Sequence, residues 1–300
     1  METPQLSRSQ FSADELRDHI KKFLDSSYGG RTQTQATYAG ALREFVRWYE
    51  QDRKFLFITA DVFRYRDYLI EQKNLSQASV STYLSGLRGF FEFLRGQGLL
   101  THNPARHVRG SVGRSSPECE VLTESEVDRL IAAVDLNDRR GTRDLVILRL
   151  MVQYGVSESE LVRANVKDYV VIAGGGVLRL QSRGRESRVV LRDDMITLLN
   201  DYLALRSNVL PSQPLFLSDG NRTRGMRMSV RGIRERINQY LELAGIRDGG
   251  TRDISPHVLR NTAGRQMARS GASVDEIRYR MRIRSLARAV KYMDQSRAAI

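Results

Sequence analysis

The sequence has one cysteine, Cys119, and four histidines. A single cysteine excludes an internal disulfide and any metal cluster built from cysteines, and it is typical of a protein in a reducing compartment. There is no run of about 18 apolar residues, and the stretch from Met1 to Asp18 lacks the apolar core of an export signal. We therefore expect a cytoplasmic protein with no membrane segment.

Lysine is also scarce, although the chain is strongly basic. Lysine and arginine together number 48 against 35 acidic residues, a net charge of +13, and only six of the 48 are lysines. The planar fork of arginine grips phosphate with two hydrogen bonds, so this composition favours a nucleic acid partner over a merely solvated basic surface. With 300 residues, of which 41% are hydrophobic, the chain can form one to three domains, and two is the expectation.

Helical periodicity extends from Ser12 to about Val108, with apolar and aromatic residues three and four positions apart. Ser12 and Glu15 have the spacing of a capping box at the first helix. The pattern predicts a helical domain over residues 1–108 with aromatic stripes in its core. Arginines on the opposite faces are candidates for contacts with a DNA backbone, in competition with simple solvation: Arg43, Arg47, Arg88 and Arg95.

A basic segment rich in glycine and serine follows Asn103-Pro104, and it predicts a linker over residues 109–121. Such a linker suits two domains that close around a duplex. Thr123 and Glu126 then form a second capping-box pattern, which opens a domain over residues 122–300. This domain is mostly helical, with a β-hairpin about Arg183-Gly184-Arg185. The predicted fold class is mainly α with a small β-sheet.

The stretch Ser255-Pro256-His257-Val258-Leu259-Arg260 places a histidine and an arginine one turn apart at the start of a helix. An arginine that holds phosphate oxygens, beside an imidazole that moves a proton, suits a phosphate under attack. Tyr292 follows in a basic tail. A phenol needs nearby cations to act as a nucleophile at neutral pH, and this tail supplies them. Each feature alone has a structural explanation, a packed histidine or a packed tyrosine.

Together these features resemble the tyrosine recombinase, or phage integrase, family. The resemblance includes the HxLR motif, Ser270-Gly271-Ala272 and a near-terminal tyrosine, and it extends to Val121-Leu122-Thr123-Glu124 at the entry to the catalytic domain. The stretch from Tyr154 to Val162 is similar to the family's first catalytic motif, and the hairpin about Arg183 is similar to its catalytic hairpin. The N-terminal helices that lead to Asn103-Pro104-Ala105 resemble a core-binding, SAM-like domain.

The resemblance implies that Tyr292 attacks a scissile phosphate in duplex DNA and forms a 3′-phosphotyrosyl bond, with Arg260 and His257 assisting. It implies no metal or nucleotide cofactor, because arginines stabilise the charge that Mg²⁺ neutralises in many phosphoryl transfers. It also implies homo- or hetero-tetramers with other recombinase subunits on DNA and action near the nucleoid of a bacterium or archaeon. The expected genetic context is a mobile genetic element, with an integrase, a transposon recombinase and a resolvase as open alternatives.

Three positions depart from the family pattern. Ser157 stands where the family has its first arginine, and Arg183 or Arg185 stands where it has a lysine that acts as a general acid. Ile283 stands where it has histidine or tryptophan. A serine hydroxyl cannot replace a bidentate cation, and the high pKa of arginine makes it a poor acid.

Two hypotheses follow from these departures. In the first, the protein is an active recombinase with a rebuilt site, in which Arg183 or Arg185 supplies the charge missing at Ser157 and Arg282 or Arg284 assists at the third position. In this hypothesis Arg284 also belongs to the DNA-binding residues. In the second, the protein is a catalytically impaired DNA-binding subunit that works with another recombinase. Retention of His257, Arg260 and Tyr292 together favours the first.

Overall fold

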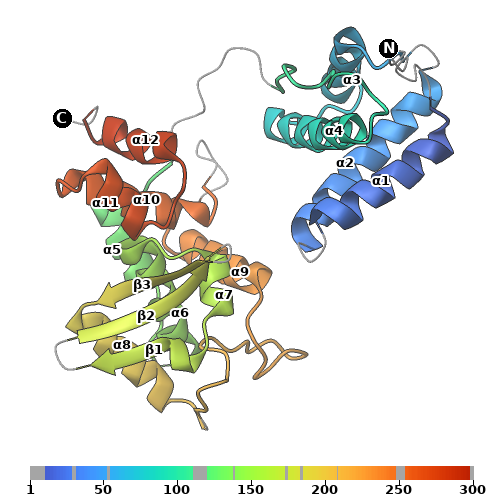
Figure 1. Ribbon diagram of the computed structural model, residues 1–300. Helices are drawn as coiled ribbons and strands as arrows, with labels where there is room; N and C mark the ends of the chain where they lie inside the picture. Colours follow the sequence, from blue (N-terminus) through green and yellow to red (C-terminus); the bar gives the residue numbers. More distant parts are fainter. Residues whose placement is uncertain are drawn as a thin grey trace. The chain divides into compact units, whose positions relative to one another are not determined.

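The structure is a computed structural model of the 300-residue chain, and it divides into two compact units, Met1–Pro117 and Glu118–Ile300 (Figure 1). The division lies within the segment predicted as a linker. Each unit is described by itself, and the described residues are 11–28, 32–52, 55–110, 120–137, 139–172, 175–182, 185–207, 209–247 and 254–297.

The first unit consists of helices around an aromatic core. Their bounds are α1 (Ala13–Tyr28), α2 (Thr32–Gln51), α3 (Thr59–Glu71) and α4 (Gln77–Gly96). Phe45 at the centre contacts the rings of Phe55, Tyr65 and Phe91 edge to face, with centroids 5.2–5.7 Å apart. Aromatic pairs prefer this geometry, so the stripes that predicted helices also form the core.

The capping box predicted at Ser12 is confirmed. The Ser12 amide donates to a Glu15 carboxylate oxygen at 2.8 Å, and the Glu15 amide donates to the Ser12 hydroxyl at 3.2 Å.

The half-buried Arg88 on α4 contacts the segment that follows this helix. It donates to the carbonyls of Ala105 and Val108 at 3.1 and 2.9 Å. This arginine fixes the segment that follows α4 onto the helix.

The second unit combines helices with one small sheet, which confirms the predicted fold class. Its helices are α5 (Glu124–Ala132), α6 (Arg139–Tyr154), α7 (Glu158–Arg163), the 3₁₀ turn η1 (Val166–Asp168), α8 (Asp193–Ala204), α9 (Val230–Leu243), α10 (His257–Arg269), α11 (Val274–Arg280) and α12 (Leu286–Arg297). Helix α6 begins at Arg139, earlier than the apolar run from Asp144 indicates. Its first turn is polar, and the next turn buries Arg143 and Asp144 as an ion pair.

The sheet has the order β1-β2-β3 and is antiparallel, with strands β1 (Tyr169–Ile172), β2 (Gly175–Ser182) and β3 (Arg185–Leu191). Ser182 pairs with Arg185, which confirms the predicted hairpin. Leu178, Leu180 and Val189 are buried on one face, where α8 packs against β2, whereas Val190 is 73% exposed on the other. Strand β1 is an addition to the sequence prediction.

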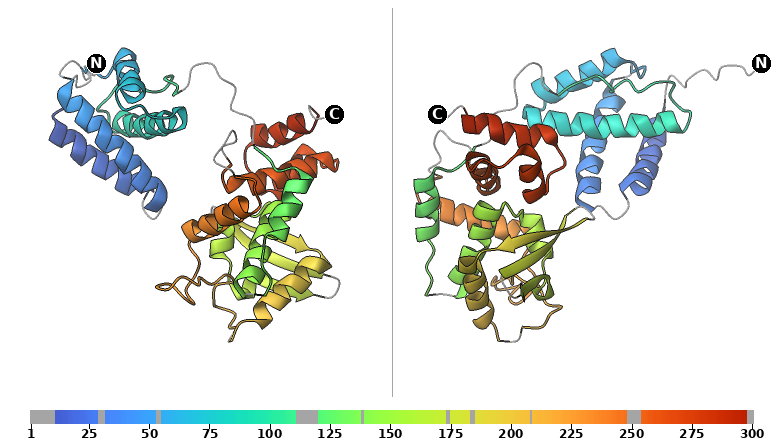
Figure 2. Two further views of the ribbon diagram at one scale, coloured as in Figure 1. Left: turned by 180° about the vertical axis from the view of Figure 1, so that it is seen from behind. Right: turned by 60° about the vertical axis from the view of Figure 1, so that its left-hand side comes forward.

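Helices α10, α11 and α12 form a cluster at one end of the second unit, and α10 also packs on α6 (Figure 2). Met267, Ile277, Met281 and Ala289 fill the space between them. Helix α11 ends at Arg280, two residues before Arg282. It ends there because Arg282 adopts a left-handed backbone conformation, with φ of 55°, that an α-helix does not contain.

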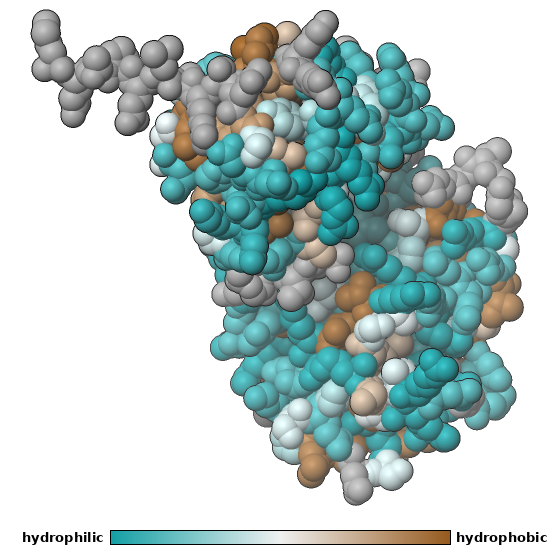
Figure 3. All heavy atoms as spheres, turned by 90° about the vertical axis from the view of Figure 1, so that its right-hand side faces the viewer, coloured by the Kyte–Doolittle hydropathy of each residue, from teal (hydrophilic) through white to brown (hydrophobic). Residues whose placement is uncertain are grey.

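The face in Figure 3 is largely hydrophilic, and its hydrophobic residues lie in small separate groups. Large exposed side chains such as Leu136, Leu243 and Tyr279 are far apart in the sequence. Of the described helices, none is long and apolar enough to cross a membrane.

The carbonyl contacts of Arg88 predict a structural role for this side chain. We expect Arg88→Ala to lower the free energy of unfolding by about 1.5–3 kcal/mol, the range for hydrogen bonds from a charged donor. The matched control is Arg95→Ala on the same helix, where an exposed side chain pairs with Glu92 at 2.5 Å and should leave stability unchanged. Urea unfolding of both variants measures the difference, and equal stabilities would contradict the assignment.

Candidate active site

Tyr292 lies on α12 and is 1% exposed, inside the cluster formed by α10, α11 and α12. Its hydroxyl donates a hydrogen bond to the Asn261 side-chain oxygen at 3.1 Å. Asn261 also donates from its amide nitrogen to the carbonyl of Glu120 at 3.3 Å. The predicted nucleophile is therefore held beside the residue that follows Arg260 on α10.

Gly264 permits this packing. A Cβ built at position 264 would lie 2.7–2.9 Å from three ring atoms of Tyr292, closer than carbon atoms approach. The phenol ring therefore rests directly on the backbone of α10, one helical turn after Arg260. This contact brings α12 near the helix that carries the other candidate residues.

Arg260 and Arg282 both bind the carboxylate of Glu160, which is 1% exposed. Arg260 donates to one oxygen at 3.0 Å, and the Nε of Arg282 donates to the other at 2.9 Å. The remaining contacts fix both guanidinium groups, since Arg260 donates to the Met281 carbonyl and Arg282 donates to the Gly155 carbonyl at 2.7 Å. Three buried charges thus meet at the start of α7.

The electrostatics of this cluster favour an ionised Glu160. Burial by itself would raise the pKa of Glu160, but the attraction and hydrogen bond of Arg282, together with the attraction of Arg260, outweigh burial and leave the pKa lowered. Ser157 adds to this, because its amide and its hydroxyl both lie 2.8 Å from the same carboxylate oxygen. The serine is turned toward Glu160 as the first residue before α7.

His257 begins α10 and is half-buried. Arg288 of α12 donates to its Nε2 at 2.6 Å, which requires that nitrogen to accept and the ring to be neutral. Burial lowers the pKa of His257, and repulsion by Arg288 lowers it further. A neutral imidazole with a cation on one nitrogen can exchange a proton with a reacting group once Arg288 moves.

The other predicted site residues lie elsewhere. Arg185 is exposed at the first position of β3, Arg284 is exposed between α11 and α12, and Arg183 lies outside the described residues. Ile283 packs its half-buried side chain against the cluster that contains Tyr292. Its contribution is apolar contact, without a hydrogen-bond donor.

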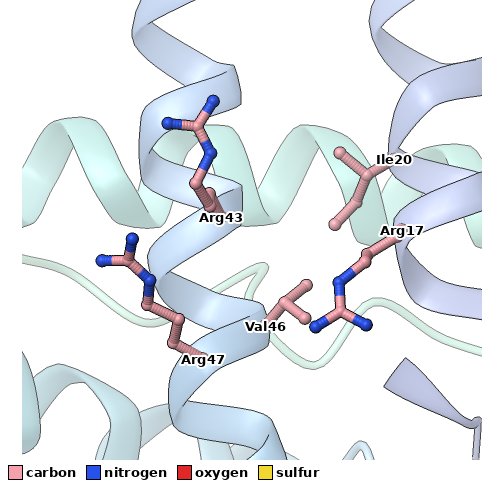
Figure 4. Close-up of a pocket in the computed structure, with 5 residues that line it drawn as sticks. All are labelled: Arg17, Ile20, Arg43, Val46 and Arg47. Carbon is pink, nitrogen blue, oxygen red and sulfur yellow. The ribbon is translucent and has the colours of Figure 1, made fainter. Parts of the chain in front are cut away.

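In the first unit, Arg43 and Arg47 are exposed on one face of α2. They line a notch of about 340 Å³ with Ile20, Val46 and Arg17, drawn in Figure 4. Arg47 contacts Glu44 at 3.3 Å, and Arg17 pairs with Asp14 at 2.7 Å and with Glu50. The notch therefore combines arginine side chains with the apolar side chains of Ile20 and Val46.

Sequence reasoning did not anticipate three of the site contacts. Asn261 as the acceptor for Tyr292, Arg288 on His257 and Glu160 as the shared carboxylate emerge from the packing of α7, α10 and α12. One feature of the sequence could have indicated the ion pairs. Glu160 lies three residues after Ser157, and an acid buried there needs a cation near it.

Gly264→Ala tests the close contact beneath Tyr292. We expect the added methyl group to displace the ring and to destabilise the protein by about 1–3 kcal/mol, the cost of overpacking, which exceeds the helix propensity gain of about 1 kcal/mol. Gly232→Ala on α9 is the control, because its Cβ would meet only the Ser229 hydroxyl at 3.4 Å. Urea unfolding and NMR of the Tyr292 ring measure both variants; a stabilised Gly264→Ala would contradict the packing.

Glu160→Gln tests the shared carboxylate through its pH dependence. We expect a loss of about 3–5 kcal/mol at pH 7, since the variant leaves two buried arginines without an anion. A lowered pKa gives stability that is present above the unfolded-state pKa of about 4.3 and is lost as pH falls through the folded value. The difference between wild type and variant should therefore shrink below about pH 4. A difference that is constant with pH would contradict this assignment.

The sequence matches two family models that together cover most of the chain. Residues 120–298 match the phage integrase family, and residues 16–99 match the phage integrase N-terminal SAM-like domain.

Curated relatives and solved structures agree with these matches. The chain is 32% identical over 220 residues to "Tyrosine recombinase XerC" of Yersinia pestis, covering 72% of this chain and 69% of the relative. It is 30% identical over 266 residues to "Tyrosine recombinase XerD" of Pseudomonas aeruginosa, covering 85% of each. A crystal structure of XerH site-specific recombinase bound to palindromic difH substrate has a TM-score of 0.73 at 17% identity, covering 96% of this chain and 82% of that one. These findings and the arrangement around Tyr292 agree: the chain belongs to the phage integrase family of tyrosine recombinases.

Proposed function

We propose that this protein carries out site-specific DNA recombination through a 3′-phosphotyrosyl intermediate on Tyr292. The observation that carries the proposal is the packing of α12 on α10. This packing holds the Tyr292 ring against the helix that bears His257 and Arg260, with its hydroxyl on Asn261. A tyrosine needed only for packing does not require a histidine and a buried arginine on the helix against which it packs.

In each step one phosphodiester linkage is exchanged for another, so the number of these linkages does not change. The Tyr292 oxygen attacks the scissile phosphorus, a bond to the phenol oxygen forms, and the bond to the 5′ oxygen breaks. The phenol loses its proton and the leaving 5′ oxygen gains one. Arg260 stabilises the charge on the non-bridging oxygens, and neutral His257 exchanges a proton with the reacting groups. A 5′-hydroxyl of the partner strand then reverses the step. The arginines stabilise the charge of both steps, and the proposal includes no cofactor.

Arg183 and Arg185 of the hairpin are proposed to reach the DNA backbone near the leaving group. Arg185 is exposed at the first residue of β3, where it is accessible to a duplex. Arginine has too high a pKa to be an efficient acid, so its role there is electrostatic. The proton for the 5′ oxygen then comes through His257 or water.

Duplex DNA is the proposed substrate, and the relatives support this choice. One similar structure is described as XerH bound to a difH substrate and another as a Tn1549 transposon integrase in complex with a circular intermediate DNA. The exposed arginines Arg43, Arg47 and Arg284 are proposed to bind backbone phosphates. Arg95, paired with Glu92, is proposed as a weaker contact, whereas Arg88 is committed to the carbonyls that follow α4.

The proposed assembly is a tetramer of recombinase subunits on paired sites, acting at the nucleoid in the cytoplasm. The net charge of +13 suits a DNA-bound complex. A mobile element is the proposed genetic context. One observation favours a second candidate function, a DNA-binding subunit that works with an active recombinase: Ser157 brings no charge to the position of the family's first arginine.

A nicked duplex that traps the covalent intermediate tests the proposed function. We expect the wild-type protein to form a covalent protein–DNA adduct and Tyr292→Phe to form none, since phenylalanine lacks the attacking oxygen. Tyr279→Phe is the matched control, because Tyr279 is 77% exposed on the neighbouring helix and should leave adduct formation unchanged. Tight DNA binding without adduct, with partner recombinases added, would support the accessory function instead.

A further inference from the structure

The family resemblance predicts an arginine at position 157, but this chain has a serine there, and the serine binds Glu160. Its amide and hydroxyl bind Glu160, and it precedes the first turn of α7. Two neutral contacts satisfy part of the carboxylate but leave its charge unbalanced. A cation must therefore reach this end of α7 from another segment of the chain.

Arg260 supplies one such cation, and Arg282 supplies a second. The side chain of Arg282 is 5% exposed, and it contacts both oxygens of Glu160, at 2.9 and 3.3 Å. It also donates to the carbonyl of Gly155, two residues before Ser157. The guanidinium of a residue between α11 and α12 thus lies beside the position where the family has its first arginine.

The backbone of Arg282 carries a conformational cost. Its φ of 55° lies in the left-handed region that glycine adopts freely and that is unfavourable for residues with a side chain. A strained arginine persists where its side chain makes contacts that offset the strain. The four contacts of its guanidinium, including one to the Arg280 carbonyl at 2.5 Å, meet this condition.

The same turn positions Arg260 from two sides. Arg260 donates to the carboxylate that Arg282 shares, and its other terminal nitrogen donates to the carbonyl of Met281, the residue before Arg282. In charge terms, Glu160 and Arg260 alone would form a neutral buried pair. With Arg282 present the cluster has a net charge of +1, so Arg260 keeps attraction for a phosphate.

We propose that Arg282 replaces the arginine missing at position 157: it is a positioning residue that neutralises Glu160, so that the positive charge of Arg260 is not cancelled and stabilises the scissile phosphate. This inference rests on the proposed function and revises the expected source of the charge, which comes from the turn after α11 and not from the hairpin arginines. Arg284, two residues on, is exposed and does not share this role.

Arg282→Gly is the decisive variant, because glycine accepts the left-handed backbone and removes only the side chain. Single-turnover adduct formation at saturating nicked duplex, well below the melting midpoint of each variant, separates cleavage from folding and binding. We expect Arg282→Gly to slow adduct formation by about a hundredfold to a thousandfold, the effect of removing one preorganised electrostatic contact. Arg231→Ala on α9, where the side chain is 88% exposed and pairs with Glu235, has the same loss of net charge and should stay close to the wild-type rate.

The double variant Ser157→Arg, Arg282→Gly tests the replacement directly. We expect the arginine returned to position 157 to restore most of the lost rate. A folded Arg282→Gly protein that cleaves at the wild-type rate would overturn the proposal. A folded, DNA-bound double variant that stays as slow as Arg282→Gly would also overturn it.

A second readout does not depend on cleavage. In a Tyr292→Phe background, removal of Arg282 should reduce the slope of log Kobs against log salt concentration by about one, and Ser157→Arg should restore it. An unchanged slope would count against Arg282 even if the wild-type protein forms no adduct. Absence of adduct in the wild type with an altered slope would reject the proposed function and retain the charge role of Arg282.

Discussion

A single buried carboxylate, that of Glu160, organises the end of the second unit where the candidate site lies. It receives two guanidinium groups and the amide and hydroxyl of Ser157. A buried acid without cations would be too costly to keep ionised, and two buried arginines without an anion would be equally costly. Helix α7, helix α10 and the turn after α11 therefore depend on one another, since each supplies one charge of the cluster.

This dependence explains how a departure from the family pattern is accommodated. The position before α7 lacks its expected cation, and the charge enters from a distant part of the chain, through a residue whose backbone is left-handed. The charge balance around Glu160 and the proposed phosphate site then involve the same cluster. On our proposal, the chain tolerates the loss of an arginine at position 157 because Glu160 requires a positive charge within hydrogen-bond distance, and Arg282 supplies one.

The nucleophile candidate is controlled by packing as well as by charge. Tyr292 is buried over Gly264 and bonded to Asn261, while Arg288 of the same helix covers His257. Helix α12 thus delivers one residue to the site and shields another. Both contacts lie between α12 and α10, so a movement of one helix relative to the other would alter them together.

The sequence by itself determined the family, the mostly helical fold with a hairpin, and the helix that carries His257 and Arg260, because periodicity, capping patterns and short motifs are local. It did not reveal the partners of Ser157, the left-handed turn at Arg282 or the Asn261 contact of Tyr292. The Asn261–Tyr292 and Glu160–Arg282 contacts join residues 31 and 122 positions apart, so they follow from how helices pack. Only the tertiary structure decides which arginine pairs with a buried carboxylate. All arginines carry the same charge, and the fold determines which of them is buried beside Glu160.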